Sequence, residues 1–322
     1  MPLLKPISLS VIVPVYNEED NIRPFLVRIE KVFVDMGIVY EIIFALDPCS
    51  DKTEAVILGE IERNPAIKLL VFSRRFGQPA ATMAGILNCG GNACVVIDVD
   101  LQDPPELINE MYLKLQQDSN EVVYAQRRSR KGETIPKRLI SYTGYWIINK
   151  LTDIKIPPNT GDFRIISRRV IEELRLLNES HGFLRGLVAY IGYKQAFIEY
   201  DRDERYAGKG NYNRITGSLK IGLNGLIGFS SRPLSIMSFV GFLLSCLSFL
   251  LGAWYVFQKL VGVNLTPGLS TTILIVTFFA GVQLLGLGLI GEYVGRIYDE
   301  VKRRPMFLVD RKVNFDHDKH PK

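Results

Sequence analysis

Short apolar runs alternate with amphipathic stretches over the first two-thirds of the chain. Five runs have the length and apolar character of buried strands: residues 8–15, 40–46, 67–73, 93–100 and 121–126. Charged or amphipathic stretches of helical length lie between them, at residues 20–36, 51–63, 78–89 and 105–118. Repeated strand–helix–strand units predict an α/β fold in which a parallel sheet is covered on both faces by helices.

The last third of the chain contains two long apolar runs. Residues 236–257 and 271–291 carry no charged side chain, and each reaches the roughly 20 residues that a helix needs to cross a bilayer. The link between them holds one cation, Lys259, whereas arginine and lysine residues flank the outer ends of both runs. The positive-inside rule therefore predicts a multi-pass protein of the inner (plasma) membrane, with the amino-terminal domain and both termini in the cytoplasm.

Composition narrows the kinds of partner and compartment. The net charge of +5 is modest and no nucleic-acid-binding motif accompanies it, so we expect no nucleic-acid partner. Cys49, Cys89, Cys94 and Cys246 form no C-x-x-C pair, which predicts neither a disulfide framework nor a zinc site. Acidic residues at positions 18–20 argue against a secretory signal peptide.

Polar side chains follow the predicted strands at the points where each strand ends. These segments are residues 16–19, 47–53, 74–78 and 98–106. Because ligands of such sheets bind beyond the carboxyl ends of the strands, we expect these side chains to form one site. The chain has no G-x-G-x-x-G after the first strand and no G-x-x-x-x-G-K-[ST], which argues against a dinucleotide enzyme or a P-loop phosphohydrolase.

Asp98 and Asp100 form a D-x-D pair at the end of a strongly apolar run. Where the chain turns, both carboxylates can approach one ion, and such oxygen ligands suit Mg²⁺ or Mn²⁺ shared with substrate phosphates. An isolated D-x-D is more often a solvated acidic turn. Here the other polar strand ends favour a metal site.

Five motifs together resemble a known family. VIVPVYNEE, D-x-x-S-D-x-T, RRFGQPAATMAGI, DVDLQDPPE and TGDFRIISRRV occur in the order and spacing of glycosyltransferase family 2 enzymes, which have the Rossmann-like GT-A fold. The greatest resemblance is to polyprenyl-phosphate glycosyltransferases, which include dolichyl-phosphate mannose synthases and bactoprenol glucosyltransferases of the GtrB type. The sequence departs from the residues that are common in the family at four positions, Pro48, Cys49, Gln78 and His181. These differences bear on which nucleotide-sugar is the donor more than on the class of reaction.

The resemblance implies an inverting transfer of a hexose to a polyprenyl phosphate, undecaprenyl phosphate being favoured, to give a lipid-linked monosaccharide. UDP-glucose is the favoured donor, and GDP-mannose or a modified UDP-sugar is the alternative. A less favoured alternative is an inactive membrane scaffold of the same fold. Such a protein would be expected to have lost one of four residues that this chain retains: Asp98, Asp100, Asp162 and Arg205. Relatives form tetramers, so a homo-oligomer is expected.

The same resemblance assigns residues to the donor site. Mg²⁺ or Mn²⁺ would be held by Asp98, Asp100 and Gln102. Arg205 belongs to R-x-x-R-x-x-G-K-x-x-Y, which is similar to a mobile loop that closes over the diphosphate in the family. The nucleotide-sugar ligands are expected to be Pro14, Tyr16, Glu18, Asp47, Asp98, Val99, Arg127, Arg202 and Lys209.

Three residues are expected to be catalytic: Asp100, Asp162 and Arg205. The counterpart of Asp162 in relatives is called the catalytic base. A phosphate monoester has a second pKa near 6, however, so at neutral pH much of the acceptor is already dianionic. We therefore hypothesise that Asp162 positions the acceptor, or an arginine such as Arg164, rather than removing a proton.

Apolar residues at helical spacing predict two helices in the plane of the membrane interface, at residues 136–152 and 212–229. The acceptor phosphate is expected to meet Lys137, Arg138, Ser141 and Arg164. The predicted divisions are a cytosolic GT-A catalytic domain (1–211), a juxtamembrane amphipathic helix (212–232), a two-helix transmembrane domain (233–298) and a cytosolic tail (299–322).

Overall fold

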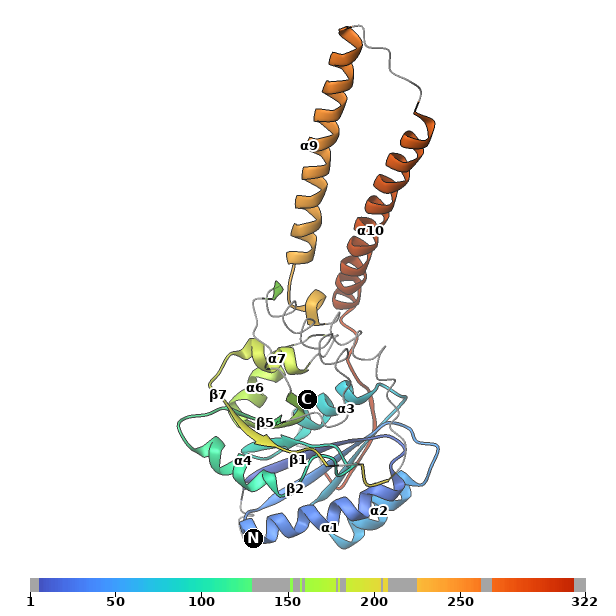
Figure 1. Ribbon diagram of the computed structural model, residues 1–322. Coiled ribbons are helices and arrows are strands. Elements are labelled where there is room, and N and C mark those ends of the chain that lie inside the picture. The colour runs from blue at the N-terminus through green and yellow to red at the C-terminus, as the bar shows by residue number, and fades with distance from the viewer. Residues whose placement is uncertain are drawn as a thin grey trace.

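The structure, a computed structural model, describes residues 6–128, 151–152, 157, 160–177, 179, 184–203, 205–207, 225–261 and 268–315. A layered α/β domain carries two long helices that project from one of its sides (Figure 1). Of the two predicted interfacial helices, only residues 151–152 and 225–229 lie within the described residues, and residues 225–228 are helical.

One mixed sheet of eight strands forms the centre of the domain. Its strand order is β7-β5-β6-β4-β1-β2-β3-β8. The strands are β1 (Leu9–Val15), β2 (Tyr40–Leu46), β3 (Ile67–Phe72), β4 (Ala93–Val96), β5 (Val122–Arg127), β6 (Thr160–Ser167), β7 (Gln195–Tyr200) and β8 (Val309–Val313).

The predicted parallel sheet is confirmed for four strands and wrong for the sheet as a whole. β4, β1, β2 and β3 lie next to one another in parallel. β6 is inserted between β4 and β5 and runs antiparallel to both, and β8 pairs antiparallel with β3. β6, β7 and β8 were not predicted, because none of them is a continuous apolar run like the buried parallel strands.

Helices cover both faces of the sheet, as the alternating pattern predicts. One face packs against α1, α2 and α4 through side chains such as Phe25, Ile57 and Ile108. The other face packs against α3, α6 and α7. These helices are α1 (Glu19–Met36), α2 (Thr53–Arg63), α3 (Gln78–Asn88), α4 (Leu107–Gln116), α6 (Arg168–Leu176) and α7 (Leu184–Ile191).

The helix α3 lies so close to β1 that one of its glycines has no room for a side chain. A Cβ atom on Gly85 would lie 2.2 Å from Cγ2 of the buried Ile12. We expect Gly85→Ala to destabilise the domain by about 1–3 kcal/mol, because α3 or Ile12 must move. The shift of the unfolding midpoint of the purified protein measures this effect.

A second helical glycine provides the matched control. A Cβ atom on Gly59 in α2 would have no other atom within 4 Å. Gly59→Ala should therefore stabilise the domain by roughly 0.5–1 kcal/mol, since alanine loses less conformational freedom than glycine when a helix forms. Equal effects of the two substitutions would contradict the close contact between α3 and β1.

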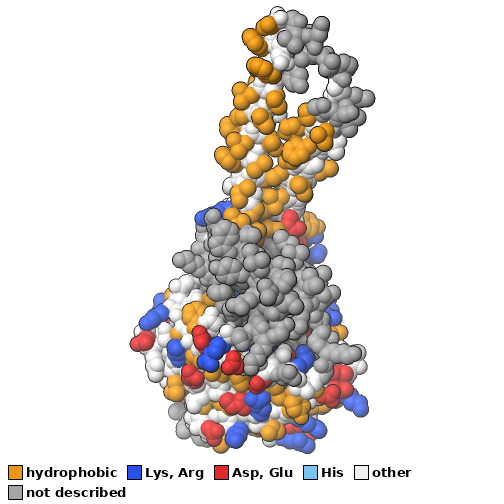
Figure 2. All heavy atoms as spheres, viewed as in Figure 1, with side chains coloured by type: hydrophobic (Ala, Val, Ile, Leu, Met, Phe, Trp, Pro, Cys, Tyr) orange, Lys and Arg blue, Asp and Glu red, His pale blue; other side chains and the backbone are white. Residues whose placement is uncertain are grey.

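Two long apolar helices follow the domain: α9 (Arg232–Leu260) and α10 (Leu269–Lys302). Both are long and apolar enough to cross a membrane by length and composition. Their apolar side chains are largely exposed and form a continuous hydrophobic surface, whereas charged side chains gather on the domain (Figure 2). Apolar surface of this extent needs a membrane or another protein to cover it. Since both helices are also long enough to cross a bilayer, the chain is membrane-associated.

The segment after α10 returns to the domain and completes the sheet. The ring of Phe307 lies 6.0 Å from that of Phe72, and Arg311 pairs with Glu54. The Asn314 amide donates to the carbonyl oxygen of Ile67 at 2.6 Å. Residues 309–313, which were predicted to belong to a C-terminal tail, are thus an edge strand of the sheet. The domain is connected to both apolar helices at the same side (Figure 1).

Candidate active site

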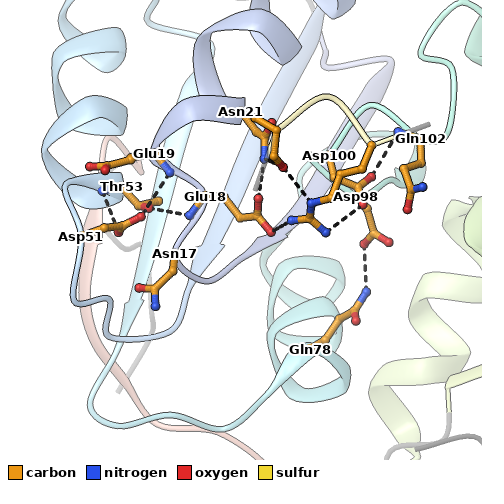
Figure 3. A network of polar contacts seen from close by, with 12 residues as sticks. Asn17, Glu18, Glu19, Asn21, Asp51, Thr53, Gln78, Asp98, Asp100 and Gln102 are labelled. Atoms are coloured by element: carbon orange, nitrogen blue, oxygen red, sulfur yellow. Dashed lines mark hydrogen bonds and ion pairs between the residues drawn. The ribbon is translucent and has the colours of Figure 1, made fainter. Parts of the chain in front are cut away.

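The loops that follow β1 and β2 hold one another at the carboxyl edge of the sheet. Asn17, which has a left-handed φ of 54°, accepts the backbone N–H of Ser50 at 2.9 Å. The Thr53 hydroxyl accepts the N–H of Glu18 at 2.8 Å, and Asp51 accepts that of Glu19 at 3.2 Å. Figure 3 shows this contact between the two loops. These contacts hold the backbone of Glu18 and Glu19 in place beyond the carboxyl end of β1.

The loop after β3 is held by a buried carboxylate. Asp47, which is 3% exposed, accepts the backbone N–H groups of Phe76 at 2.9 Å and Gly77 at 2.8 Å. The Arg75 guanidinium lies 3.9 Å above the ring of Tyr16. Pro14 is the penultimate residue of β1. Three of the predicted nucleotide-sugar residues, Pro14, Tyr16 and Asp47, therefore lie at one edge, and Asp47 also shapes the loop.

Arg205 connects two predicted site carboxylates that are far apart in the sequence. Its guanidinium pairs with Glu18 and, at 3.3 Å, with Asp100. The segment that carries it is also held by backbone contacts, since the N–H of Tyr206 donates to the carbonyl oxygen of Asp100 at 3.2 Å. The structure thus brings Glu18, Asp100 and Arg205 together.

Asp98 lies among like charges in the turn that follows β4. The strand ends at Val96, earlier than predicted, and Leu101 in the turn has a φ of 59°. Asp98 accepts the Gln78 side-chain amide at 2.8 Å. Burial, together with the nearby carboxylates of Asp103, Asp100 and Asp162, raises the pKa of Asp98 to about 8. Negative charge at this turn is therefore incompletely balanced by the protein's own cations.

This excess of carboxylate charge fits a divalent cation. The oxygen atoms of Asp98 and Asp100 are the donors that Mg²⁺ and Mn²⁺ prefer. Within the described residues, no set of three or more histidine, cysteine, aspartate or glutamate side chains is arranged to hold a metal. A cation at the two aspartates would therefore share ligands with a bound phosphate or with water. Gln102 is the third residue that was predicted to hold the cation. Its side-chain amide nitrogen donates to the carbonyl oxygen of Asp203 at 3.4 Å.

A second set of charges surrounds the buried Asp103. Its carboxylate accepts the Tyr200 hydroxyl and lies 3.5 Å from Arg202 and 3.9 Å from Arg127. Burial and the charge of Asp103 raise the pKa of Tyr200, so this hydroxyl stays protonated. The predicted donor residues Arg127 and Arg202 therefore lie together, and Val99 is buried in the turn between the two sets of charges.

Asp162 is clamped by two arginines. It lies 2.8 Å from a terminal nitrogen of Arg164 and 3.0 Å from Nε of Arg185. Burial alone would raise the pKa of Asp162, but the charges of Arg185 and Arg164, together with Arg127, lower it to about 2. A carboxylate with such a low pKa is a weak base. This arrangement agrees with the hypothesis that Asp162 positions other groups.

Arg164, which was predicted to meet the acceptor phosphate, is a buried residue. The residue is 0% exposed, and its guanidinium lies between Asp162 and the ring of Tyr124 at 5.6 Å. Sequence reasoning missed Arg185, which occupies the first turn of α7. The remaining predicted site residues, Lys137, Arg138, Ser141 and Lys209, lie outside the described residues.

Comparison with known proteins shows similarity to one family and to relatives along most of the chain. Residues 10–175 match the model of a family described as glycosyl transferase family 2. The chain is 42% identical over 311 residues to the uncharacterized glycosyltransferase YkcC of Bacillus subtilis, covering 97% of this chain and 96% of that one. It is 36% identical over 304 residues to the bactoprenol glucosyl transferase of Shigella phage SfII, covering 94% of this chain and 98% of that one.

Proposed function

Because the chain belongs to glycosyltransferase family 2, we propose that it transfers glucose from UDP-glucose to a polyprenyl phosphate at the cytoplasmic face of a membrane. The observation that carries this proposal is the length of its similarity to bactoprenol glucosyl transferases. The alignment spans 304 of the 322 residues of this chain. The residues outside the alignment are fewer than those in either α9, which has 29, or α10, which has 34, so neither helix can lie wholly outside it. The resemblance therefore includes the apolar helices as well as the catalytic domain.

The proposed reaction needs no strong base. An oxygen atom of the acceptor phosphate forms a bond to the anomeric carbon, and the bond from that carbon to the nucleoside diphosphate breaks with its electron pair leaving on the diphosphate. A single in-line displacement inverts the anomeric configuration. The acceptor's second pKa is near 6, so its nucleophilic dianion is present at neutral pH.

The chain's charged groups match the changes in charge during this reaction. A divalent cation bound by Asp98 and Asp100 would neutralise charge on the departing diphosphate. Arg205, which pairs with Asp100 and Glu18, would contact the diphosphate directly. Arg127 and Arg202 add fixed positive charge at the other side of the site. Such preorganised charges stabilise a leaving group in the transition state.

The exposed helices lead to two further proposals about the assembly. We propose that α9 and α10 cross the membrane and hold the catalytic domain in the cytoplasm, with the donor site beside the lipid headgroups. We also propose that the protein is a homo-oligomer, a tetramer being favoured, because contacts between subunits would cover part of the apolar surface of these helices.

A donor panel tests the proposed reaction. Purified full-length protein receives undecaprenyl phosphate and one radiolabelled donor at a time: UDP-glucose, UDP-galactose, UDP-N-acetylglucosamine or GDP-mannose. We expect label in the lipid fraction from UDP-glucose. Label from GDP-mannose alone would refute the donor assignment and keep the reaction class. Incorporation from no donor by folded protein would refute the reaction class.

A small substitution beside Arg127 tests the role of this arginine in donor binding. A Cβ atom on Gly161 would lie 2.8 Å from a terminal nitrogen of Arg127, so Gly161→Ala must displace the guanidinium. We expect the KM for the donor to rise about 10-fold, since misplacement by 1 Å is costly in a preorganised site. Steady-state kinetics measure this, with Gly59→Ala as the control. An unchanged donor KM would remove Arg127 from the donor site.

A further inference from the structure

Gln78, the first residue of α3, contacts one of the two carboxylates that fit a divalent cation. Its side-chain amide nitrogen donates to Oδ1 of Asp98 at 2.8 Å, and Figure 3 shows the amide pointing toward this carboxylate. Among the described residues, none hydrogen-bonds to the other oxygen of Asp98, Oδ2, or forms an ion pair with it. The contact therefore engages one oxygen of the carboxylate and leaves the second for a cation.

The backbone on both sides of Gln78 is held in place. Before it, the buried Asp47 accepts two backbone N–H groups, that of Phe76 with Oδ1 and that of Gly77 with Oδ2. Gly77 has a φ of 88°, which lies in the left-handed region that glycine adopts readily. After it, the buried hydroxyl of Thr82 donates to the carbonyl oxygen of Gln78 at 2.9 Å. The start of α3 is thus fixed by contacts that do not involve the Gln78 side chain.

The segment that follows α10 supports the same loop by packing. The ring of Phe72, at the end of β3, lies 6.1 Å from that of Phe76 and 6.0 Å from that of Phe307. Phe76 precedes Gln78 by two positions in the loop between β3 and α3. The loop that carries the amide is therefore supported by the sheet and by the C-terminal segment, and the amide is presented to the carboxylate from a fixed backbone.

An amide at this position can orient a carboxylate without cancelling its charge. The side chain of glutamine donates through N–H groups and carries no net charge. A lysine or arginine side chain could hold the carboxylate equally well, but its positive charge would repel a bound cation. Groups that hydrogen-bond to the ligands of a metal orient those ligands, and their loss usually weakens metal binding 10- to 100-fold.

We propose that Gln78 is a positioning residue that orients the Asp98 carboxylate for a divalent cation and, being uncharged, leaves the negative charge of that carboxylate to the cation. Gln78 acts through Asp98 and contacts neither the cation nor the substrates. The inference rests on the proposed function, because it concerns the cation that would neutralise the departing diphosphate. It adds a requirement that the two aspartates alone do not contain.

The affinity for Mn²⁺ alone tests this role without sugar transfer. Mn²⁺ is titrated into the full-length protein, and electron paramagnetic resonance measures the free ion. Gln78→Met, which keeps the length of the side chain and removes its N–H donors, is expected to raise the Kd for Mn²⁺ about 10-fold or more. Gln78 is exposed, so the substitution leaves the packing of the core intact, and the unfolding midpoint should stay at the wild-type value.

Two further variants separate orientation, charge and general effects of substitution. Gln78→Lys keeps a donor and adds positive charge, so it should weaken Mn²⁺ binding at least as much as Gln78→Met does. Gln116→Met is the matched control, because Gln116 is an exposed glutamine at the last position of α4. The control should leave the Kd for Mn²⁺ unchanged. A glutamine that only begins α3 would give the wild-type Kd in all three variants.

The outcomes distinguish this inference from the function on which it rests. Suppose that the wild type binds Mn²⁺ and that Asp100→Asn weakens this binding. A Gln78→Met variant with the wild-type Kd would then overturn the inference alone. A Gln78→Lys variant with the wild-type Kd would also overturn it, since charge at this position would not reach the cation. A wild-type protein that binds no Mn²⁺, or whose binding is unchanged in Asp100→Asn, would instead overturn the cation site of the proposed function.

Discussion

Replacing Asp100 by asparagine is expected to lower the rate of sugar transfer about 10³-fold, the upper range for losing one electrostatic contact to a transition state. The substitution removes one of two carboxylates proposed to hold the cation. It also removes a partner of Arg205, which pairs with Asp100 at 3.3 Å. Both groups are proposed to stabilise the departing diphosphate, so their contributions are lost together.

Initial rates with saturating Mg²⁺ or Mn²⁺ measure this effect. Asp35→Asn is the matched control, because Asp35 is exposed near the C-terminal end of α1, far along that helix from Glu18. We expect this control to keep the wild-type rate and metal dependence. A rate for Asp100→Asn within ten-fold of the wild type, at any metal concentration, would place the cation site elsewhere.

Replacing Asp162 by asparagine is expected to lower kcat/KM about 10²-fold, by the same factor at every pH between 5 and 9. The ion pairs with Arg164 and Arg185 lower the pKa of this carboxyl group to about 2. A depressed pKa means that the stabilisation from these pairs is fully present above the unfolded value of about 3.9 and is lost as pH falls through about 2. Asp162 therefore stays ionised across the measured range.

The pH profiles of wild type and variant separate a positioning residue from a general base. Both should fall below about pH 6, because the acceptor phosphate loses its dianionic form there. Parallel profiles support positioning. If the variant loses an acidic limb that the wild type has, while its acceptor KM is unchanged, Asp162 removes a proton and is not a positioning residue.

Much of the sheet could be predicted from local patterns, and the reasons for the failures are physical. β2 was predicted with its observed bounds, because a buried parallel strand is a continuous apolar run. β6 carries Asp162 and Arg164 among its first five residues, so its sequence did not resemble a buried strand. β8 lies 237 or more positions after its partner β3, and no local pattern encodes pairing over such a separation.

The site residues that follow the ends of strands could be predicted from the sequence. Those that join the site through contacts between distant parts of the chain could not. Glu18, Asp98 and Asp100 follow strands and were found from that position. The pairing of Asp162 with Arg164 follows from alternation within one strand, in which residues two apart share a face. Arg185 reaches Asp162 from a helix 23 positions later. Its neighbours along the chain give no sign of this contact.

The most direct test of the account is formation of the lipid-linked monosaccharide by the purified full-length protein. Wild type and Asp100→Asn receive UDP-glucose, undecaprenyl phosphate and Mn²⁺, with EDTA in a parallel sample, and mass spectrometry analyses the lipids. The account predicts a hexosyl phospholipid with wild type and Mn²⁺, and a loss of about 10³-fold in Asp100→Asn and with EDTA. The same product in equal amount from the wild type, the variant and the chelated sample would contradict the proposed catalytic site.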